Sequence, residues 1–501
     1  MLARVRGCTI FGVEGKMVDV EVYLSSQLPS FDIVGLPDAA VREARDRVRA
    51  AVKNSSFHFP PQRIIVNLAP ADLKKEGPQL DLALALGILF ASKQLEVPTD
   101  WVYLGELALD GTLRPVRGVL PMVMAAREAG CRNLLLPLAN AAEAALVKGV
   151  RIVGAESLEQ AVAILSGRQI PPPIPAYKQP NSIKQDDFQV VKGQENAKRA
   201  LEVAAAGGHN VLMTGPPGSG KTMLARCVPS ILPPMSEEES LETTKIYSAA
   251  GLLPENSGLI TKRPFRSPHH TLTPTALCGG GHNPRPGEVS LAHNGVLFLD
   301  EMPEFRRETL EVLRQPLEEG TVTVTRLQSS YTYPSRFMLL ASMNPCPCGM
   351  LFDPEVECVC TQRQIHNYRH KISGPLLDRI DIFVEVARLR YDEVAGTGRG
   401  ESSAEIAARV AAARARQLKR FAKHSLTCNA QMSGQQIQSY CKPDAAGRDL
   451  LRNAFTRLRL TARAYDRILK VARTIADLEA EKNILPKHLA EAISYRQALH
   501  Y

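Results

Sequence analysis

The segment GPPGSGKT has the residue types and the spacing of a loop that binds nucleotide phosphates. Its glycines leave backbone N–H groups free to point at phosphate oxygens, Lys221 reaches the β- and γ-phosphates, and the hydroxyl of Thr222 is a ligand for Mg²⁺. The apolar run NVLMT precedes the loop and the helix-compatible run MLAR follows it, which is the context that this chemistry requires. The sequence therefore predicts an ATP site built from Gly215, Pro216, Pro217, Gly218, Ser219, Gly220, Lys221 and Thr222.

A pair of adjacent carboxylates, Asp300 and Glu301, ends the apolar run GVLFLDE. At the end of a buried strand, Asp300 would hold hydrated Mg²⁺ together with Thr222, and Glu301 would polarise the water that attacks the γ-phosphate. An isolated match of this kind is usually a strand followed by a charged turn. A phosphate-binding loop in the same chain favours the catalytic interpretation, so we predict a Mg²⁺-dependent ATPase.

Two further polar residues follow apolar runs in the same region. Asn344 comes after RFMLLAS, where a side-chain amide can orient the lytic water, although an isolated asparagine there is more often a turn residue. Arg379 stands between Asp378 and Asp381 in GPLLDRID. This spacing by itself predicts a local ion pair at a helix end.

Four cysteines form two Cys-x-Cys pairs within MNPCPCGMLFDPEVECVC. Four thiolates can enclose one tetrahedral Zn²⁺. The alternatives are two disulfides, which a reducing cytosol disfavours, or four thiols without a ligand, which such clustering disfavours. We predict a structural Zn²⁺ in a small insertion, residues 346–360, held by Cys346, Cys348, Cys358 and Cys360.

The elements that position these residues belong to a multidomain α/β chain of 501 residues. The central unit, residues 188–390, contains apolar runs that are each followed by a loop, the pattern of a parallel α/β sheet. Within it, alternation in TVTVT and YTY predicts a β-hairpin ahead of another sheet strand. The predicted nucleotide ligands therefore lie at the ends of strands of one sheet.

The flanking units have different patterns. Residues 1–168 mix short strands, such as an alternating strand over 18–24, with helices, such as one over 38–55. The proline-rich and polar residues 169–187 predict a linker. Residues 391–501 begin with glycines and charges and are then almost all of helical pattern, including 460–480.

Composition and charge limit the classes of protein. The start of the chain has no sustained apolar core, and the longest apolar run, LALALGILFA, is about half of what a membrane-spanning helix needs, so we expect a cytoplasmic protein without a membrane span. The net charge is +9, and residues 401–501 hold 18 Lys and Arg against 9 Asp and Glu. This basic surplus is compatible with nucleic-acid binding or with solvated helix faces.

The order GPPGSGKT, GVLFLDE, SMNP and GPLLDRID resembles an AAA+ ATPase of the magnesium-chelatase-like branch. More narrowly, RPFRSPHHT, NPCPCG and LTARAYDRILKVARTIADLE resemble the bacterial ComM/YifB family, and the resemblance runs from end to end. It implies that Asn344 is the sensor 1 residue and that Arg379 is an arginine finger for the ATP of a neighbouring subunit. It also implies a C-terminal helical lid with Arg463 as the sensor 2 residue, or else Arg467. A finger that acts in trans implies a homo-oligomer, and the family implies a hexamer.

The N-terminal unit resembles the S5-like α+β protease domain of Lon in KKEGPQLDLALALGIL and GELALDGTLRPVRG. Lon-type peptidases place a serine directly after such a Gly-Pro and use a lysine from the second segment. Here Gln79 follows Pro78, and residues 111–118 contain arginines, which cannot act as the base, and no lysine. We expect the fold without the catalytic dyad. Subunit assembly, DNA contact and a structural role all remain open.

The resemblance to ComM implies a motor that moves DNA by branch migration during recombination in natural transformation, with branched or single-stranded DNA as the partner. A different function class is a protein-remodelling ATPase like the magnesium-chelatase motor subunit, and an ATP-dependent Lon-like protease is opposed by Gln79. Helicase-like relatives carry pore-lining insertions near the predicted hairpin and near residues 262–288. The basic side chains there either contact phosphates or pair with acidic neighbours between subunits: Lys262, Arg263, Arg266 and Arg326.

Overall fold

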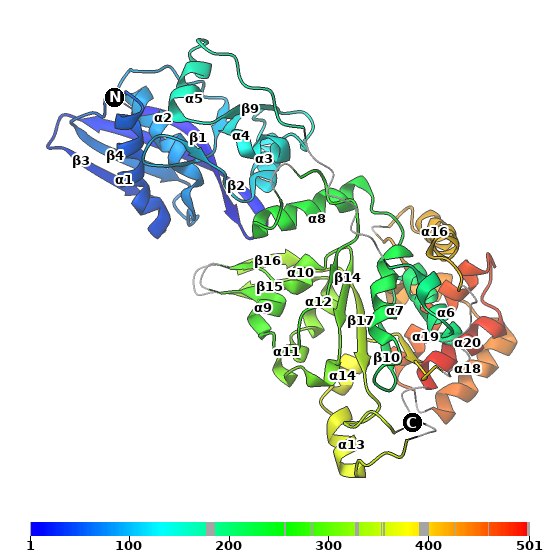
Figure 1. The fold of residues 1–501 in the computed structure, drawn as a ribbon. Helices are drawn as coiled ribbons and strands as arrows, with labels where there is room; N and C mark the ends of the chain where they lie inside the picture. Colours follow the sequence, from blue (N-terminus) through cyan, green and yellow to red (C-terminus); the bar gives the residue numbers. More distant parts are fainter. Residues whose placement is uncertain are drawn as a thin grey trace.

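The computed structural model describes residues 2–176, 186–254, 257–281, 284–325, 330–351, 353, 356–389, 400–424, 426–458 and 460–497. The described residues form two large sheets, three two-stranded sheets and a C-terminal group of helices (Figure 1), which confirms the predicted mixed α/β multidomain architecture. None of the helices in these ranges combines the length and the apolar character needed to cross a membrane.

The N-terminal unit is built on a seven-stranded sheet in the order β3-β4-β2-β1-β5-β8-β9. The antiparallel strands β1 (Leu2–Phe11), β2 (Glu14–Ser25) and β4 (Arg63–Ala69) adjoin the parallel strands β3 (Ser30–Val34), β5 (Trp101–Tyr103), β8 (Asn133–Pro137) and β9 (Arg151–Ala155). The strand predicted over 18–24 is part of β2, where buried and more exposed residues alternate. A small hairpin pairs β6 (Glu106–Leu107) with β7 (Leu113–Arg114).

Five helices cover this sheet: α1 (Ala39–Asn54), α2 (Asp81–Ala91), α3 (Val119–Glu128), α4 (Leu138–Ala144) and α5 (Leu158–Leu165). The helix predicted over 38–55 is α1, and the Asp38 side chain caps it by accepting a hydrogen bond from the backbone N–H of Val41. The long apolar run is α2, whose side chains are nearly all buried in the core of this unit. This run is apolar because it forms a helix that is buried in the core of the unit.

The central sheet consists of five parallel strands in the order β11-β14-β17-β10-β18. They are β10 (Val211–Thr214), β11 (Phe265–Arg266), β14 (Val296–Leu299), β17 (Met338–Met343) and β18 (Ile382–Glu385). The three predicted apolar strands are β10, β14 and β17, which are neighbours. Because parallel strands end at one edge, the loops after these three strands meet there.

Short elements surround this sheet. The helices are α6 (Glu195–Gly207), α7 (Lys221–Cys227), α8 (Glu237–Ala250), α9 (Pro274–Cys278), α10 (Glu288–Leu291), α11 (Arg307–Glu311), α12 (Arg314–Glu319), α13 (Gln362–Arg369) and α14 (Gly374–Leu377). Two small antiparallel pairs are β12 (Gly279–Gly280) with β13 (Arg285–Pro286), and β15 (Thr321–Thr325) with β16 (Ser330–Pro334). The second pair is the predicted hairpin, and Arg326 in its turn lies outside the described residues.

The C-terminal helices are α16 (Ser403–Arg420), α17 (Gly434–Tyr440), α18 (Ala445–Arg457), α19 (Ala462–Leu478) and α20 (Pro486–Gln497). The helix predicted over 460–480 is α19. One hydrophobic core joins these helices to α6, β10 and β18. The lid therefore packs on the strand that leads into the predicted phosphate loop.

Much of the basic surplus of this region is used inside the protein. Arg420 and Arg473 pair with the buried carboxylate of Asp477, and Arg409 pairs with Glu202 of α6. Arg414 donates to the backbone oxygen of Ala205 and Lys470 to that of Ala430. These cations hold the lid together and against the core, so the charge count is a weak indicator of a DNA-binding surface.

The N-terminal unit docks on α8 and on the β15–β16 hairpin (Figure 1). The ring of Phe11 stacks on Tyr331 with 4.4 Å between ring centroids, and Val13 lies in one buried cluster with Tyr331 and Tyr333. The backbone N–H of Gly118 donates to the backbone oxygen of Ser248, at 3.0 Å. The hairpin is thus held against the N-terminal unit through its strand β16.

Replacing Tyr331 with alanine is expected to lower the free energy of unfolding by about 3 kcal/mol, because a buried aromatic side chain is lost. Replacing Phe11 with alanine should cost less in the Tyr331→Ala background than in the native chain, since the stacked pair contributes about 1 kcal/mol of its own. Denaturant unfolding of the four proteins measures both values. Tyr23→Ala, at a half-exposed position, is the control.

Candidate ATPase active site and cysteine cluster

The predicted phosphate loop connects β10 to α7. Its residues Gly218 and Gly220 have φ values of 76° and 92°, which glycine adopts without a steric penalty. The side chain of Lys221 folds back into the loop and donates to the backbone oxygens of Gly215 and Pro216, both at 2.8 Å. Burial lowers the pKa of Lys221. The loop thus encloses its own lysine in carbonyl oxygens.

The two predicted Mg²⁺ ligands lie side by side. The hydroxyl of Thr222 donates to one carboxylate oxygen of Asp300 at 2.8 Å. The other oxygen of Asp300 accepts a hydrogen bond from the hydroxyl of Ser342, which is fully buried in β17. Sequence analysis missed Ser342, although a serine in an otherwise apolar strand is the signal that would have found it.

Glu301 has an unusual backbone. Its φ is 51°, a left-handed conformation that is uncommon outside glycine, and its N–H donates to the Ser342 hydroxyl at 3.0 Å. The side chain is exposed at the carboxyl edge of the sheet. Strained backbone of this kind is concentrated at functional sites, and here it holds Glu301 directly beyond Asp300.

Asn344 follows β17 and joins the same group. Its side-chain oxygen lies 3.3 Å from the Nζ atom of Lys221, which donates to it. The structure therefore brings together the predicted residues Lys221, Thr222, Asp300 and Asn344, with Glu301 adjacent to them. All five lie in the loops after β10, β14 and β17 or directly beside those loops.

The predicted arginine finger and sensor 2 residue lie elsewhere. Arg379 follows α14, is buried, donates to the backbone oxygen of Pro375 at 2.7 Å, and pairs with Glu318. Arg463 lies near the start of α19 and lines a hollow of about 250 Å³ together with Arg379 and Glu318. The lining of this hollow contains none of the phosphate-loop residues. The structure brings the two arginines to each other and not to Lys221 of the same chain.

The sequence by itself predicted that Arg379 pairs with a neighbouring aspartate, and this prediction is wrong. Arg379 pairs with Glu318 of α12, which is distant in the sequence, while Asp381 pairs with Arg467 of α19. Asp381 is buried and also accepts a hydrogen bond from the backbone N–H of Asn210, at 3.0 Å. Burial raises the pKa of Asp381, but Arg467 and His209 outweigh it and hold this pKa well below its usual range. Arg467 is therefore paired with a buried carboxylate, whereas Arg463 lines the hollow beside Arg379.

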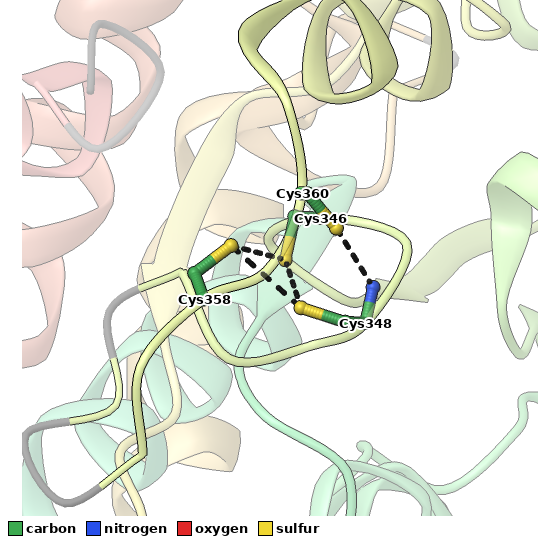
Figure 2. Close-up of side chains that lie close together, drawn as sticks. All are labelled: Cys346, Cys348, Cys358 and Cys360. Carbon is green, nitrogen blue, oxygen red and sulfur yellow. Dashed lines mark hydrogen bonds between the residues drawn. The ribbon is translucent and has the colours of Figure 1, made fainter.

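Figure 2 shows the four cysteine side chains converging on one point. Their sulfur atoms all lie within 4.8 Å of one another, and those of Cys346, Cys348 and Cys358 are separated by 3.4, 3.6 and 3.7 Å. Zn–S bonds of about 2.3 Å in a tetrahedron place sulfurs about 3.8 Å apart. The thiols are unpaired, so the disulfide alternative does not apply in this structure. The backbone N–H of Met350 lowers the pKa of the Cys348 thiol, whereas burial and the neighbouring thiols raise the pKa values of Cys358 and Cys360.

The basic residues near the hairpin pair with acidic groups of their own chain. Arg263 bonds to Glu239 at 2.9 Å, and Arg266 makes two bonds of 2.7 Å to Glu288. Lys262 also has a partner. Acidic pairing is therefore the better of the two interpretations for Arg263 and Arg266, although it occurs within a subunit and not between subunits.

Gln79, at the position of the missing serine, has a structural role. Its buried side-chain amide donates to the Thr9 hydroxyl at 2.8 Å and to the backbone oxygen of Glu76 at 2.5 Å. An amide that is bonded in this way offers no nucleophile. Gln79 thus contributes hydrogen bonds to the packing of the N-terminal unit.

Comparison with known proteins decides the family. A family model described as "Magnesium chelatase, subunit ChlI" matches residues 187–394, and models of the same subunit match 20–140 and, as its C-terminal part, 400–496. The chain is 43% identical to "Competence protein ComM" of Haemophilus influenzae over 506 residues, which cover 99% of this chain and 97% of that protein. It is 44% identical to "Uncharacterized protein YifB" of Salmonella typhimurium over 502 residues, with 99% and 97% covered.

The chain belongs to the ComM/YifB family. The resemblance predicted from the sequence is thereby confirmed, and membership makes the chain a magnesium-chelatase-like AAA+ ATPase that uses ATP and Mg²⁺. A shorter stretch of this ComM/YifB chain is similar to a protease. Over 94 residues, which cover 18% of this chain and 17% of the relative, it is 27% identical to "Lon protease 2" of Bacillus subtilis.

Proposed function

We propose that this chain is the subunit of a cytoplasmic hexameric ATPase that acts on branched or single-stranded DNA, as a branch-migration helicase or translocase in recombination during natural transformation. The proposal of a ring rests on one observation. Arg379 and Arg463 line a common hollow, and the lining of this hollow contains no residue of the phosphate loop of their own chain. Such arginines can complete an ATP site only when a neighbour presents its nucleotide to them.

In the proposed site the residues have separate tasks. The phosphate loop, from Gly215 to Thr222, holds the triphosphate, with Lys221 on the β- and γ-phosphates. Thr222 and Asp300 hold Mg²⁺, Glu301 activates the attacking water, and Asn344 orients it. Arg379 and Arg463 of the adjacent subunit neutralise the charge that develops on the γ-phosphate. The contact between Lys221 and Asn344 supports this assignment.

We divide the chain into a Lon-like unit without the dyad over 1–168, a linker over 169–187, an AAA+ core over 188–390 and a helical lid over 391–501. The core carries the cysteine insertion, 346–360. Parts of the linker and of the start of the lid lie outside the described residues. The separate sheets support the boundary between the N-terminal unit and the AAA+ core, while the lid shares one hydrophobic core with the ATPase.

We assign Zn²⁺ to Cys346, Cys348, Cys358 and Cys360 as a structural metal. The sulfur separations and the lack of any histidine or carboxylate in the cluster fit a tetrahedral site of four thiolates. When bound, the metal would supply rigidity to an insertion that is too small for its own core.

The choice of DNA as the partner rests on the relative named as a competence protein. The family model, described as a magnesium-chelatase subunit, favours the alternative of an ATPase that remodels a protein partner. The inward pairing of the lid cations and of Arg263 and Arg266 weakens the electrostatic argument for DNA. A direct assay must therefore separate the two functions.

The purified protein should show ATP turnover that a four-way DNA junction stimulates, and it should exchange the strands of that junction. Lys221→Ala removes the cation on the phosphates and Glu301→Gln removes the base, so we expect each to lose turnover by about 10²-fold or more, while Glu301→Gln still binds ATP. Phosphate release and junction gels measure both activities. If no DNA structure stimulates ATP turnover, the DNA function is contradicted and a protein substrate becomes the proposal.

A further inference from the structure

We propose that the metal held by the four cysteines keeps the phosphate loop in its nucleotide-binding shape, so that occupancy of the cysteine site sets the affinity for ATP. This inference rests on the ATP site and the Zn²⁺ site of the proposed function. It adds a physical connection between them, which runs through Gly349 and Pro217.

The path from the nucleotide site to the first cysteine is short and bonded throughout. The backbone oxygen of Met343 accepts a hydrogen bond from the N–H of Gly215 at 3.2 Å, and Asn344 accepts one from Lys221. The next residue, Pro345, accepts a bond from Arg369 of α13 at 3.2 Å. Cys346 then follows and is fully buried. Two successive residues therefore touch the phosphate loop, and the metal ligands begin two residues later.

A turn of the cysteine insertion packs directly on the phosphate loop. The backbone N–H of Gly349 donates to the oxygen of Cys346 at 3.0 Å and closes the turn that carries Cys346 and Cys348. A Cβ atom on Gly349 would lie 2.4 Å from Cδ and 2.8 Å from Cγ of Pro217. With φ at +83°, only glycine fits here without strain. The turn therefore packs directly against the ring of Pro217.

Besides the cysteines, the described part of the insertion is held by Asp353, a buried carboxylate that lies 3.4 Å from the guanidinium of Arg388. Among its described residues, the apolar side chains of Val356 and Val359 are 41% and 83% exposed, so they add no core. Cys358 and Cys360 lead into α13, whose Arg369 holds Pro345. A metal bound by both cysteine pairs would tie the end of β17 to the start of α13. Without it, the turn at Gly349 loses its connection to α13.

The expected loss of nucleotide affinity follows from the fraction of molecules whose phosphate loop is in its binding shape. If the loop without metal adopts its binding shape in about one molecule in ten, the apparent affinity for nucleotide falls about tenfold. This effect is on binding and precedes any chemistry. It is therefore measurable without ATP turnover.

The test uses the full-length protein with a fluorescent ADP analogue and metal analysis by mass spectrometry. Cys348→Ser with Cys358→Ser should lose the zinc and bind the analogue about tenfold more weakly. Gly349→Ala keeps all four thiols, so it should retain the zinc and still bind more weakly, because its methyl group displaces Pro217. Cys441→Ala, at a buried cysteine of the lid, is the matched control and should change neither value.

The outcomes are distinct. Native protein without zinc would remove the proposed metal site, and native protein that binds no analogue would remove the proposed ATP site. Zinc loss with unchanged affinity, or Gly349→Ala with native affinity, would overturn the coupling alone. If the double serine variant fails to fold, as judged by circular dichroism, Gly349→Ala and the restoration of affinity by zinc added back to chelator-treated native protein still decide the matter.

Discussion

Alanine in place of Arg379 is expected to reduce ATP turnover by about 10³-fold or more while nucleotide binding stays within about twofold, because arginine fingers act on the transition state. The structure gives this arginine no contact with the phosphate loop of its own chain among the described residues. Single-turnover phosphate release measures the loss, and equilibrium binding of a fluorescent ADP analogue measures the affinity. Arg452→Ala, at an exposed arginine of the lid, is the control.

A mixing experiment distinguishes action in trans from a local role. Lys221→Ala lacks a working phosphate loop but keeps Arg379, and Arg379→Ala has the reverse defect. Mixed assemblies contain sites in which an intact loop meets an intact finger, so turnover should rise well above that of either variant alone. An active monomer, or full turnover by Arg379→Ala, would contradict the ring.

The finger must also exchange partners. In the structure Arg379 is paired with Glu318, which is more than half exposed, and this pair closes part of the hollow that Arg463 lines. A neighbour's γ-phosphate would compete with Glu318 for the guanidinium. Glu318→Ala should therefore reduce ATP turnover far less than Arg379→Ala does, as measured by the same phosphate-release assay.

The ion pair between the buried Asp381 and Arg467 is expected to give the largest stability effect. Asp381→Asn should lower the free energy of unfolding by about 3–5 kcal/mol, because it leaves Arg467, whose side chain is only 22% exposed, without its counter-charge. Urea unfolding at neutral pH measures this loss. Glu237→Gln breaks the exposed pair with Lys148 and should leave the free energy of unfolding nearly unchanged.

The same pair predicts a pH dependence. The pKa of Asp381 is lower in the folded chain than in the unfolded chain, so its stabilisation is present above the unfolded pKa of about 3.9 and is lost as the pH falls below it. The difference in stability between the native chain and Asp381→Asn should therefore shrink in acid. A difference that is independent of pH would show that the ion pair does not carry the effect.

A large part of the nucleotide site follows from the sequence. The phosphate loop, the carboxylates Asp300 and Glu301, and Asn344 each follow an apolar run, and the three runs are neighbouring strands of the parallel sheet. Parallel strands deliver their following loops to one edge, so the pattern predicts that these side chains share an edge, and the strand order β14-β17-β10 brings them into contact. The cysteine cluster is predictable for a similar reason, because both pairs belong to one short insertion.

Contacts between distant segments were not predictable. Local spacing suggested that Arg379 pairs with its flanking aspartates, but a helix end from another part of the chain provides Glu318. The charge count of the lid suggested a basic surface, whereas carbonyl oxygens and buried carboxylates take up many of those cations. A sequence gives the sign and number of charges but not which partners the fold brings within bonding distance.

The sequence by itself determined the chemistry available to this protein: a phosphate loop, a metal-binding carboxylate with its neighbouring base, and four thiols at spacings fixed along a few residues of chain. Only the tertiary structure decided that Arg379 and Arg463 share a hollow apart from that loop, that Asp381 fastens the lid, and that Gly349 lies against Pro217. The reason is physical. Residues a few positions apart are placed by local backbone geometry, whereas residues a hundred positions apart are placed only by the packing of a whole core.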